Sequence, residues 1–348
     1  LDAGMSDSTK GGAGGLEPPL LEVQDLTMHF PVTEGFLRKR EVARVKAVDG
    51  VSFAVRRGEA FGLIGESGCG KSTLARCLLK LETPTEGRVR FDGHDVHALD
   101  AQQTRSWRRR VQAVFQDPFS SLNPRMTVRE IVGEPLVVHG VGDAAEREGR
   151  IRELLDLCGL PRRYAGRYPH EMSGGQRQRV GIARALALKP ELVVLDEAVS
   201  ALDVSIQAQI LNLFGELRDA LGLTYLFIGH DLSVVRHLCD RLAVMYLGKL
   251  AEIGTADDVF DDPQHPYTRA LLGAVPLPDP ARERARDVPV IKGEVGSAMN
   301  PPSGCVFHPR CPLAVARCER EVPLMTRRGE QHRSACHLAP LGPFEQAA

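Results

Sequence analysis

The sequence predicts an α/β fold with a mostly parallel sheet, a lobe of helices and a small cysteine-rich extension near its C-terminal end. Short apolar runs at residues 60–64, 192–195 and 224–228 lack the alternation of half-buried strands, which is typical of strands covered on both faces. Helical patterns follow the first two runs, as expected of an α/β chain. Four cysteines that follow a group of prolines predict the extension.

The 348 residues are enough for two domains, or for one large domain with an appendage. The formal net charge is −1 with both signs interspersed, whereas nucleic-acid binders usually carry a basic excess, so we expect no nucleic-acid partner. We expect Arg108, Arg109 and Arg110 to form a solvated face. No segment approaches the roughly 18 consecutive apolar residues of a membrane span, and the first residues lack the pattern of a secretory signal. We therefore expect a cytoplasmic chain that reaches a membrane only through partners.

Residues 1–19 are rich in Gly, Ser and Asp, and we assign them to a disordered or cloning-derived N-terminus. Residues 20–30 alternate apolar and polar side chains and predict a strand, which residues 51–55 follow as its partner. Residues 31–44, between them, predict a basic, irregular loop. Phe30 ends the first strand, where its ring is either a stacking surface for a purine base or an ordinary core residue.

A phosphate-binding loop, G-x-x-x-x-G-K-S, runs from Gly65 to Ser72, between the apolar run and a helical pattern at residues 73–80. Its glycines let backbone N–H groups converge on phosphate oxygens at a helix N-terminus. Lys71 is expected to reach the β- and γ-phosphates, and Ser72 to bind Mg²⁺. The alternative, a glycine-rich turn with a solvated lysine, is disfavoured by this strand–loop–helix context. The predicted nucleotide-binding residues here are Gly65, Glu66, Ser67, Gly68, Cys69, Gly70, Lys71, Ser72 and Thr73.

The middle of the chain predicts two further strands and the helical lobe. Residues 86–91 and 110–115 are the strands, and the second ends at Gln116, whose side chain could reach a bound metal ion or its water. Residues 123–157 have helical periodicity interrupted by Gly and Pro. We expect the lobe to span about residues 117–178.

A second glycine-containing motif, Ser173-Gly174-Gly175-Gln176, begins a helical pattern that runs to residue 188. Ser173 is a favourable N-cap. Two glycines weaken a helix start unless something must approach it closely, so the motif predicts a second anion site built from exposed backbone amides. A plain capped helix is the alternative.

Two acidic residues, Asp196 and Glu197, follow the apolar run at residues 192–195. The carboxyl end of a buried parallel strand borders the ligand crevice of an open α/β sheet. Asp196 is therefore expected to hold Mg²⁺ through water, and Glu197 to polarise an attacking water. A solvated acidic turn is the alternative.

Two more polar residues lie near the next elements. Asp203 is at the start of a predicted helix at residues 200–221. His230 follows the apolar run at residues 224–228, where it could form a hydrogen bond with a γ-phosphate.

The eight cysteines fall into two groups. The first is scattered and, apart from the one in the phosphate loop, predicts small core residues. Its members are Cys69, Cys77, Cys158 and Cys239. The second follows Pro276, Pro278 and Pro280 and lies in a predicted module at residues 276–348; its members are Cys305, Cys311, Cys318 and Cys336. A cytosolic chain disfavours disulfides, so the second group predicts a metal site.

The spacing of the second group, C-x5-C-x6-C-x17-C, lacks the close pair that is usual in four-cysteine zinc sites. It better suits an iron–sulfur cluster held at four corners. A zinc site with His308, His332 and His337 as spare ligands is one alternative. Buried free cysteines in a small module are the other.

The motifs occur in an order that resembles the ATPase subunits of ABC transporters over about residues 20–275. Segments at residues 116–124, 200–209 and 265–271, with the cysteine-containing extension, are similar to the oligopeptide/dipeptide importer ATPases. The resemblance implies a RecA-like nucleotide-binding domain, ATP hydrolysis with Mg²⁺, peptide uptake at the cytoplasmic face of the membrane, and a [4Fe–4S] cluster. An importer ATPase for another substrate, such as nickel, and a non-transport ABC ATPase are the alternatives.

The resemblance also implies how the residues act. Two cassettes would face each other, with ATP between Lys71 of one and the Ser173 motif of the other, and Asp203 would contact the partner. Glu197 would be the general base, supported by His230. Phe30 would stack on adenine, and Ser72 and Gln116 would bind Mg²⁺. The implied partners are a paralogous ATPase subunit, two transmembrane permease subunits and an extracytoplasmic peptide-binding protein.

Overall fold

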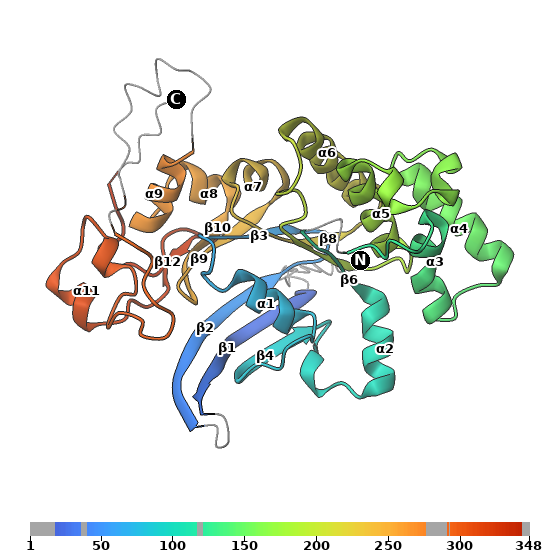
Figure 1. Ribbon diagram of the computed structural model, residues 1–348. Coiled ribbons are helices and arrows are strands. Elements are labelled where there is room, and N and C mark those ends of the chain that lie inside the picture. Colours follow the sequence, from blue (N-terminus) through green and yellow to red (C-terminus); the bar gives the residue numbers. More distant parts are fainter. Residues whose placement is uncertain (1–17, 36–39, 117–120, 276–290, 292, 343–348) are drawn as a thin grey trace, which may run out of the picture.

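The computed structural model describes residues 18–35, 40–116, 121–275, 291 and 293–342. Two sheets and their helices form its layers (Figure 1). Three stretches on which predictions fell lie outside the described residues. They are most of the N-terminal tail, the group of prolines after residue 275, and the four residues that follow Gln116.

The larger sheet has eight strands, of which five neighbouring ones run parallel. In spatial order the strands are β11 (Thr326–Arg327), β12 (Arg333–Ser334), β10 (Lys249–Thr255), β9 (Arg241–Tyr246), β3 (Ala60–Ile64), β8 (Thr224–Gly229), β7 (Leu192–Asp196) and β6 (Val111–Val114). The predicted parallel α/β core is confirmed. The phosphate loop follows β3 and the acidic pair ends β7, and only β8 lies between these two parallel strands. The loop and the acidic pair therefore lie at the same edge of the sheet.

The smaller sheet is antiparallel and corrects the predicted loop at residues 31–44. Its strands are β2 (Arg40–Val55), β1 (Leu21–Glu34), β4 (Glu86–Phe91) and β5 (His94–Asp95), in that spatial order. Pairing continues from Pro31 opposite Arg44 to Glu34 opposite Arg40, so β1 and β2 form one long hairpin. Its outer end packs on no core and needs no apolar alternation, which is why the sequence pattern missed it.

Helices cover both faces of the larger sheet (Figure 1). Leu192 and Val194 of β7 face the core that holds α1 and the antiparallel sheet, whereas Val193 and Leu195 face the core with α5, α6 and α7. This two-sided burial explains the apolar run without alternation. The helices that matter here are α1 (Lys71–Leu78), α5 (Gly174–Leu186), α6 (Val204–Leu221), α7 (Leu232–Leu238), α8 (Ala256–Asp261), α9 (Pro266–Gly273) and α11 (Ala316–Arg320).

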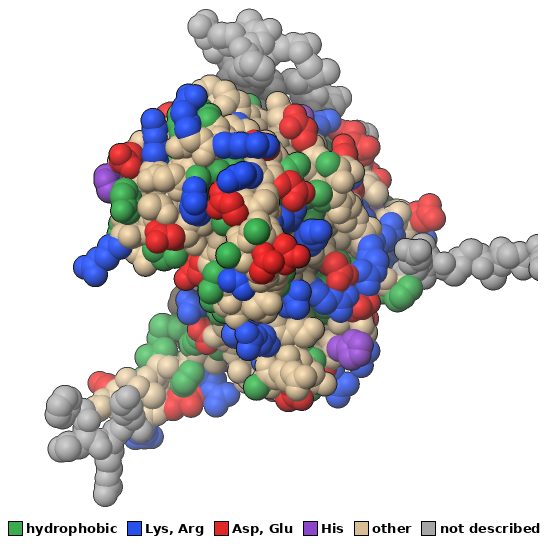
Figure 2. Space-filling view, turned by 90° about the vertical axis from the view of Figure 1, so that its right-hand side faces the viewer, with side chains coloured by type: hydrophobic (Ala, Val, Ile, Leu, Met, Phe, Trp, Pro, Cys, Tyr) green, Lys and Arg blue, Asp and Glu red, His purple; other side chains and the backbone are tan. Residues whose placement is uncertain are grey.

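The helical lobe contains α3 (Val128–Val138) and α4 (Ala144–Leu157), which lie on the side of the molecule seen in Figure 2. Both helices begin with a capping box, in which an N-cap side chain and a glutamate three residues later satisfy the first backbone N–H groups. Basic and acidic side chains are mixed on this face (Figure 2). The lobe exists as predicted, while its exact limits stay a prediction.

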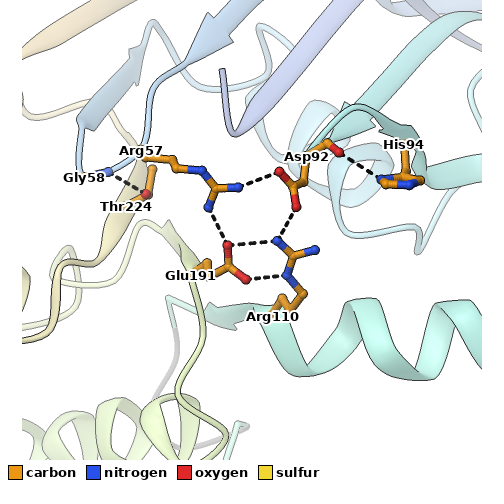
Figure 3. A network of polar contacts seen from close by, with 7 residues as sticks. All are labelled: Arg57, Gly58, Asp92, His94, Arg110, Glu191 and Thr224. Carbon is orange, nitrogen blue, oxygen red and sulfur yellow. Dashed lines mark hydrogen bonds and ion pairs between the residues drawn. The ribbon is translucent and has the colours of Figure 1, made fainter. Parts of the chain in front are cut away.

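A network of four charged side chains joins the two sheets and corrects the solvated face predicted for Arg110 (Figure 3). Arg57 lies 2.5 Å from Asp92 and 2.6 Å from Glu191, and Arg110 at the end of α2 (Ala101–Arg110) lies 2.6 Å from Asp92 and also bonds Glu191. Arg110 holds the pKa of both carboxyl groups below the ordinary range, mainly by hydrogen bonding. Charge pairing therefore fixes the corner where β3, β4, β6 and β7 begin or end.

The C-terminal segment attaches directly to the larger sheet. Strand β12 pairs with β10, where Glu252 is fully buried. The Glu252 carboxylate accepts hydrogen bonds from the backbone of Gln264 at 2.6 Å and of His265 at 3.0 Å, and lies 2.7 Å from His332. Phe307, which is 1% exposed, packs against Tyr246 and Tyr267. The boundary predicted at residue 275 stays a prediction.

Candidate nucleotide-binding site

The phosphate loop connects the fully buried strand β3 to helix α1, as its sequence predicts. Gly65 has φ +154°, and a Cβ there would lie 2.1 Å from the carbonyl oxygen of Met245. Gly70 has φ +109° and caps α1, and its Cβ would lie 2.0 Å from the carbonyl oxygen of Ala47. Side chains are excluded at both positions by backbone conformation and by close backbone neighbours. The loop is therefore held tightly against the core.

Lys71 is folded into the loop and is 4% exposed, which rules out the solvated-lysine alternative. Its Nζ donates to the carbonyl oxygens of Gly65 at 2.7 Å and Glu66 at 2.9 Å. Ser72, the next residue, is exposed at the start of α1. A buried cation beside an exposed hydroxyl at a helix N-terminus suits a phosphate group with its metal ion.

The two acidic residues end strand β7, next to the end of β8. One carboxylate oxygen of Asp196 is buried without a hydrogen-bond partner. Burial raises the pKa of Asp196, and the charge of Glu197 raises it further, whereas Lys71 lowers it. A buried acceptor that lacks a donor is a favourable ligand for a hard cation, so Asp196 fits a Mg²⁺ site.

Glu197 has a left-handed backbone conformation with φ +49°, and its N–H donates to the carbonyl of Ile228 at 2.8 Å. Its Oε1 lies 3.7 Å from Nδ1 of His230, which follows β8 and is largely exposed. The backbone thus directs Glu197 away from the strand's own line and brings it beside the histidine. The sequence placed both residues at this edge, and the structure brings them together.

Gln116 is exposed just after β6, the neighbour of β7, so it lies at the same edge of the sheet. Four residues of the segment that follows it are outside the described part of the chain. Phe30 is half-buried in β1, opposite Val45, and packs against the core of the antiparallel sheet. Its stacking role stays a prediction.

The Ser173 motif caps helix α5. The Ser173 hydroxyl accepts from the N–H of Gln176, and the Gln176 side chain accepts from the N–H of Ser173. A Cβ at Gly175 would lie 2.5 Å from Cγ2 of Ile206, so packing against α6 already requires this glycine. The prediction attributed both glycines to a ligand, and for Gly175 the structure supplies a second reason.

Asp203 is the N-cap residue of α6, but its exposed side chain makes no capping hydrogen bond. Its carboxylate is therefore exposed at the start of α6, the helix that packs against α5. Its contact across a dimer interface stays a prediction.

The four C-terminal cysteines line one small cavity together with His308 and His337. Burial raises the pKa of the Cys305 and Cys336 thiols, and that of Cys311 to about 11. Within the described residues, however, no group of three or more His, Cys, Asp or Glu side chains is arranged to hold a metal ion. The metal prediction is therefore not supported by this arrangement of the thiols.

The spare histidines of the zinc alternative have other partners. His332 bonds the buried Glu252, His308 bonds the carbonyl of Cys305, and His337 bonds the carbonyl of Glu321. Cys77, Cys158 and Cys239 are buried, as predicted. Cys69 of the phosphate loop, which that prediction left out, is buried as well.

Three residues near the loop were not predicted. The Tyr267 hydroxyl accepts from the N–H of Glu66 at 2.9 Å, and Arg310 forms an ion pair with the Glu66 carboxylate. Tyr246 packs beside both, against Phe307. The available signal was the segment at residues 265–271, together with the arginine that precedes Cys311.

Comparisons with known proteins agree with this geometry. Residues 48–200 match the ABC transporter family model, and residues 251–318 match the model of the oligopeptide/dipeptide transporter C-terminal region. The oligopeptide transport ATP-binding protein AppF of Bacillus subtilis (strain 168) is 52% identical over 92% of this chain and 97% of its own length. The chain belongs to the oligopeptide/dipeptide family of ABC-transporter ATP-binding proteins.

Further relatives of this ABC ATPase have similar names and lengths. The probable peptide ABC transporter ATP-binding protein y4tS of Sinorhizobium fredii (strain NBRC 101917 / NGR234) is 54% identical over 92% of this chain and 90% of its own. The solved structure of a dimeric post-hydrolysis state of the ATP-binding cassette MJ0796, bound to ADP and Pi, aligns with TM-score 0.60 and 31% identity. It covers 68% of this chain and 98% of that one.

The ABC ATPase has a nucleotide-binding cassette of the known fold and, in its described part, no helix that is both long and apolar enough to cross a membrane.

Proposed function

We propose that this chain hydrolyses ATP to drive the import of peptides through separate membrane subunits. The proposal rests on four side chains that lie close together at one edge of the larger sheet: Lys71, Asp196, Glu197 and His230. The C-terminal segment of the same chain matches the oligopeptide/dipeptide transporter model. The names of the relatives, which refer to oligopeptide and peptide transport, favour this substrate class. Uptake of a non-peptide substrate such as nickel is the second candidate.

The chemistry follows from the residues at that edge. Lys71 and the amides of the loop would bind the β- and γ-phosphates. Ser72, Gln116 and Asp196 would hold Mg²⁺, which neutralises charge that develops on the phosphates. Glu197 would accept a proton from the attacking water, while His230, beside it, would orient the water or the γ-phosphate.

The Ser173 motif has no role in the ATP site that its own chain forms around Lys71. A capped helix start with two glycines presents backbone amides, which suits an anion contributed by a neighbour. We infer that ATP is bound between the Lys71 loop of one cassette and the Ser173 motif of a second, with Asp203 in the contact. The second cassette is a paralogous ATPase subunit in this proposal.

The membrane partners would dock on the helical lobe. What supports this is a cleft beside α3 and α4 that is lined by Leu136 and Val141 and bordered by Arg147. Val137 and Val138, next to it, are each 59% exposed. An apolar surface with basic edges suits a short amphipathic helix from a permease loop. In this proposal the chain lies at the cytoplasmic face and works with two permease subunits and an extracytoplasmic peptide-binding protein.

We also propose that the four C-terminal cysteines hold a [4Fe–4S] cluster. They surround one cavity, and backbone N–H groups of Phe307, Leu313 and Leu338 donate to the sulfurs of three of them, which offsets part of the rise in thiol pKa that burial causes. A single ion would need all ligand atoms within about 2.3 Å of it, whereas a cluster spreads the thiolates around a larger body. The proposal is therefore for a cluster and not for a single ion.

Replacing Glu197 by Gln tests the hydrolytic assignment. We expect the variant to bind ATP with parent affinity but to hydrolyse it at least about a hundredfold more slowly in the assembled transporter, since a general base is lost. Phosphate release measures the rate, and Glu216→Gln on the exposed face of α6 is the matched control. Unchanged turnover in Glu197→Gln would reject the assignment. Parallel uptake assays in proteoliposomes with peptides and with Ni²⁺ decide between the substrates.

Metal analysis tests the cluster. Protein purified without oxygen is expected to contain iron and acid-labile sulfide in equal amounts, with a broad absorbance band in the visible range. Cys318→Ser should lose both, whereas Cys158→Ser, at a buried cysteine outside the cavity, should retain them. Zinc in place of iron, or no metal in the parent protein, would contradict the proposal.

A further inference from the structure

One ion pair joins the C-terminal segment to the phosphate loop. Arg310 Nη1 lies 2.8 Å from Glu66 Oε2, and Nη2 lies 3.2 Å from Oε1, so the contact is bidentate. The side chains of Arg310 and Glu66 are only 9% and 26% exposed. Nη1 also donates to the Tyr246 hydroxyl at 3.3 Å. This geometry makes the pair a specific contact rather than a loose surface pairing.

Glu66 is the second residue of the phosphate loop, and its backbone groups are also engaged. Its carbonyl accepts from Lys71 Nζ at 2.9 Å and from the N–H of Cys69 at 3.3 Å. Its N–H donates to the Tyr267 hydroxyl at 2.9 Å. The conformation of Glu66 and the position of Lys71 are thus coupled. A shift of Glu66 would move a carbonyl that holds the phosphate-binding lysine.

The charge of Glu66 opposes the task of the loop. A carboxylate beside a site for a polyphosphate repels it, and the half-buried position limits screening by water. Arg310 supplies the positive charge that cancels this repulsion. Within the described residues it is the cation that the structure pairs with Glu66 through side-chain contacts.

Arg310 is itself held by the C-terminal segment. It ends the short 3-10 helix η4 (His308–Arg310), and its N–H donates to the carbonyl of Phe307 at 3.0 Å. A second contact nearby runs from the N–H of Lys46 to the carbonyl of Ala298 at 2.9 Å. Lys46 precedes Ala47, whose carbonyl packs against Gly70 of the loop. The segment therefore contacts both the loop, through Arg310, and the strand that packs against the loop, through Ala298.

We propose that Arg310 is a positioning residue for the phosphate loop, which acts through Glu66 and makes ATP affinity depend on the C-terminal segment. The inference rests on the proposed function, because it assumes that the loop binds ATP. It assigns the segment a role in nucleotide binding that follows from this contact and does not depend on a metal. Loss of the guanidinium leaves Glu66 uncompensated and frees the loop.

The test compares full-length Arg310→Met with the parent and with the double variant Arg310→Met/Glu66→Gln. Binding of a fluorescent ATP analogue to the isolated chain gives the Kd, and hydrolysis by the assembled transporter gives KM and kcat separately. We expect Arg310→Met to raise Kd and KM by about tenfold with kcat within about twofold, because a partly buried charge loses its partner. The double variant should recover most of the affinity, since the unpaired charge is gone. Arg310→Lys, which keeps the charge but not the fork, should lie between the parent and Arg310→Met.

Arg317→Met is the matched control, because it removes an exposed Arg–Glu pair of the same segment, 2.7 Å from Glu321. Its Kd should equal that of the parent. The inference is overturned if Arg310→Met binds the analogue as the parent does, or if the double variant binds no better than Arg310→Met. If Arg310→Met fails to fold, the comparison of Arg310→Lys with Arg310→Lys/Glu66→Gln decides. A parent that binds no nucleotide would instead reject the proposed function.

Discussion

Gly175, a proposed nucleotide-binding residue, is also constrained by packing. Its missing side chain leaves room for Ile206 of α6, whose Cγ2 would lie 2.5 Å from a Cβ. Gly181, in the same helix, has nothing within 4 Å of its Cβ position. The two glycines can therefore be compared directly: a side chain at Gly175 would collide with Ile206, whereas one at Gly181 would meet open space.

Alanine at these two positions should have opposite effects on stability. Gly175→Ala should lower the free energy of unfolding by about 1–3 kcal/mol, because α5 or Ile206 must shift. Gly181→Ala should raise it by about 0.5–1 kcal/mol, because alanine favours the helix. Urea denaturation measures both. In an Ile206→Ala background the cost of Gly175→Ala should nearly vanish, and an undiminished cost would show that the contact is not the cause.

Asp196 shows what a single buried oxygen contributes. Its unpartnered carboxylate oxygen is unfavourable in the free protein, and its raised pKa records that cost. A site that stabilises its ligand often keeps such an unsatisfied group. The strain at Glu197, with φ +49°, is another local cost at the same strand end.

At the scale of elements, the network of Arg57, Asp92, Arg110 and Glu191 connects strands of both sheets (Figure 3). Asp92 and Glu191 have lowered pKa values, chiefly because of hydrogen bonds from Arg110. A carboxyl group whose pKa is lowered by folding stabilises the folded state at pH values above its ordinary pKa. This stabilisation is lost as the pH falls through the pKa of the folded state. The network should therefore weaken below about pH 4.

Arg110→Met tests the network. At pH 7 the variant should unfold at lower urea, with a loss of about 1 kcal/mol, since these side chains are a third or more exposed and solvent screens them. At pH 3.5 the difference from the parent should shrink. Arg162→Met, which removes the exposed pair with Asp156, should matter little at either pH. A difference that is equal at both pH values would contradict an electrostatic origin.

The elements of the C-terminal segment also show why a module can be small. Its strand β12 is added to the large sheet, and Glu252, His332 and the backbone of Gln264 satisfy one another in the buried seam. Phe307 packs against both Tyr246 and Tyr267, which also contact each other. The segment is thus stabilised by packing against the core of the ATPase and needs no large core of its own.

At the scale of the whole molecule, the proposed site is shared between two chains. Ser173→Arg should abolish ATP hydrolysis by the assembled transporter, because a large cation would occupy the position of the facing phosphates. The isolated chain should bind ATP with unchanged affinity, since its Lys71 loop is intact. Ser173→Ala, which removes only the cap hydrogen bond, should keep most of the activity. Weaker nucleotide binding by the isolated Ser173→Arg chain would contradict a shared site.

Several features could not be predicted from local patterns. The hairpin of β1 and β2 extends past Phe30 into solvent, where neither strand has a buried face to impose alternation. Arg110 looked solvated because its partners, Asp92 and Glu191, are distant in the sequence. Tyr267 and Arg310 reach the loop only because α9 and the C-terminal segment fold back over it.

The sequence by itself determined the parallel core, the phosphate loop, the capped Ser173 helix and the acidic strand end, because each depends on residues close together in the chain and on their local conformational preferences. Tertiary structure alone decided that Glu197 meets His230, that Ile206 requires Gly175, and that Arg310 neutralises Glu66. These contacts join residues whose separation along the chain carries no periodic signal. Only the folding of the sheet and the return of the C-terminal segment bring their charges and surfaces within range.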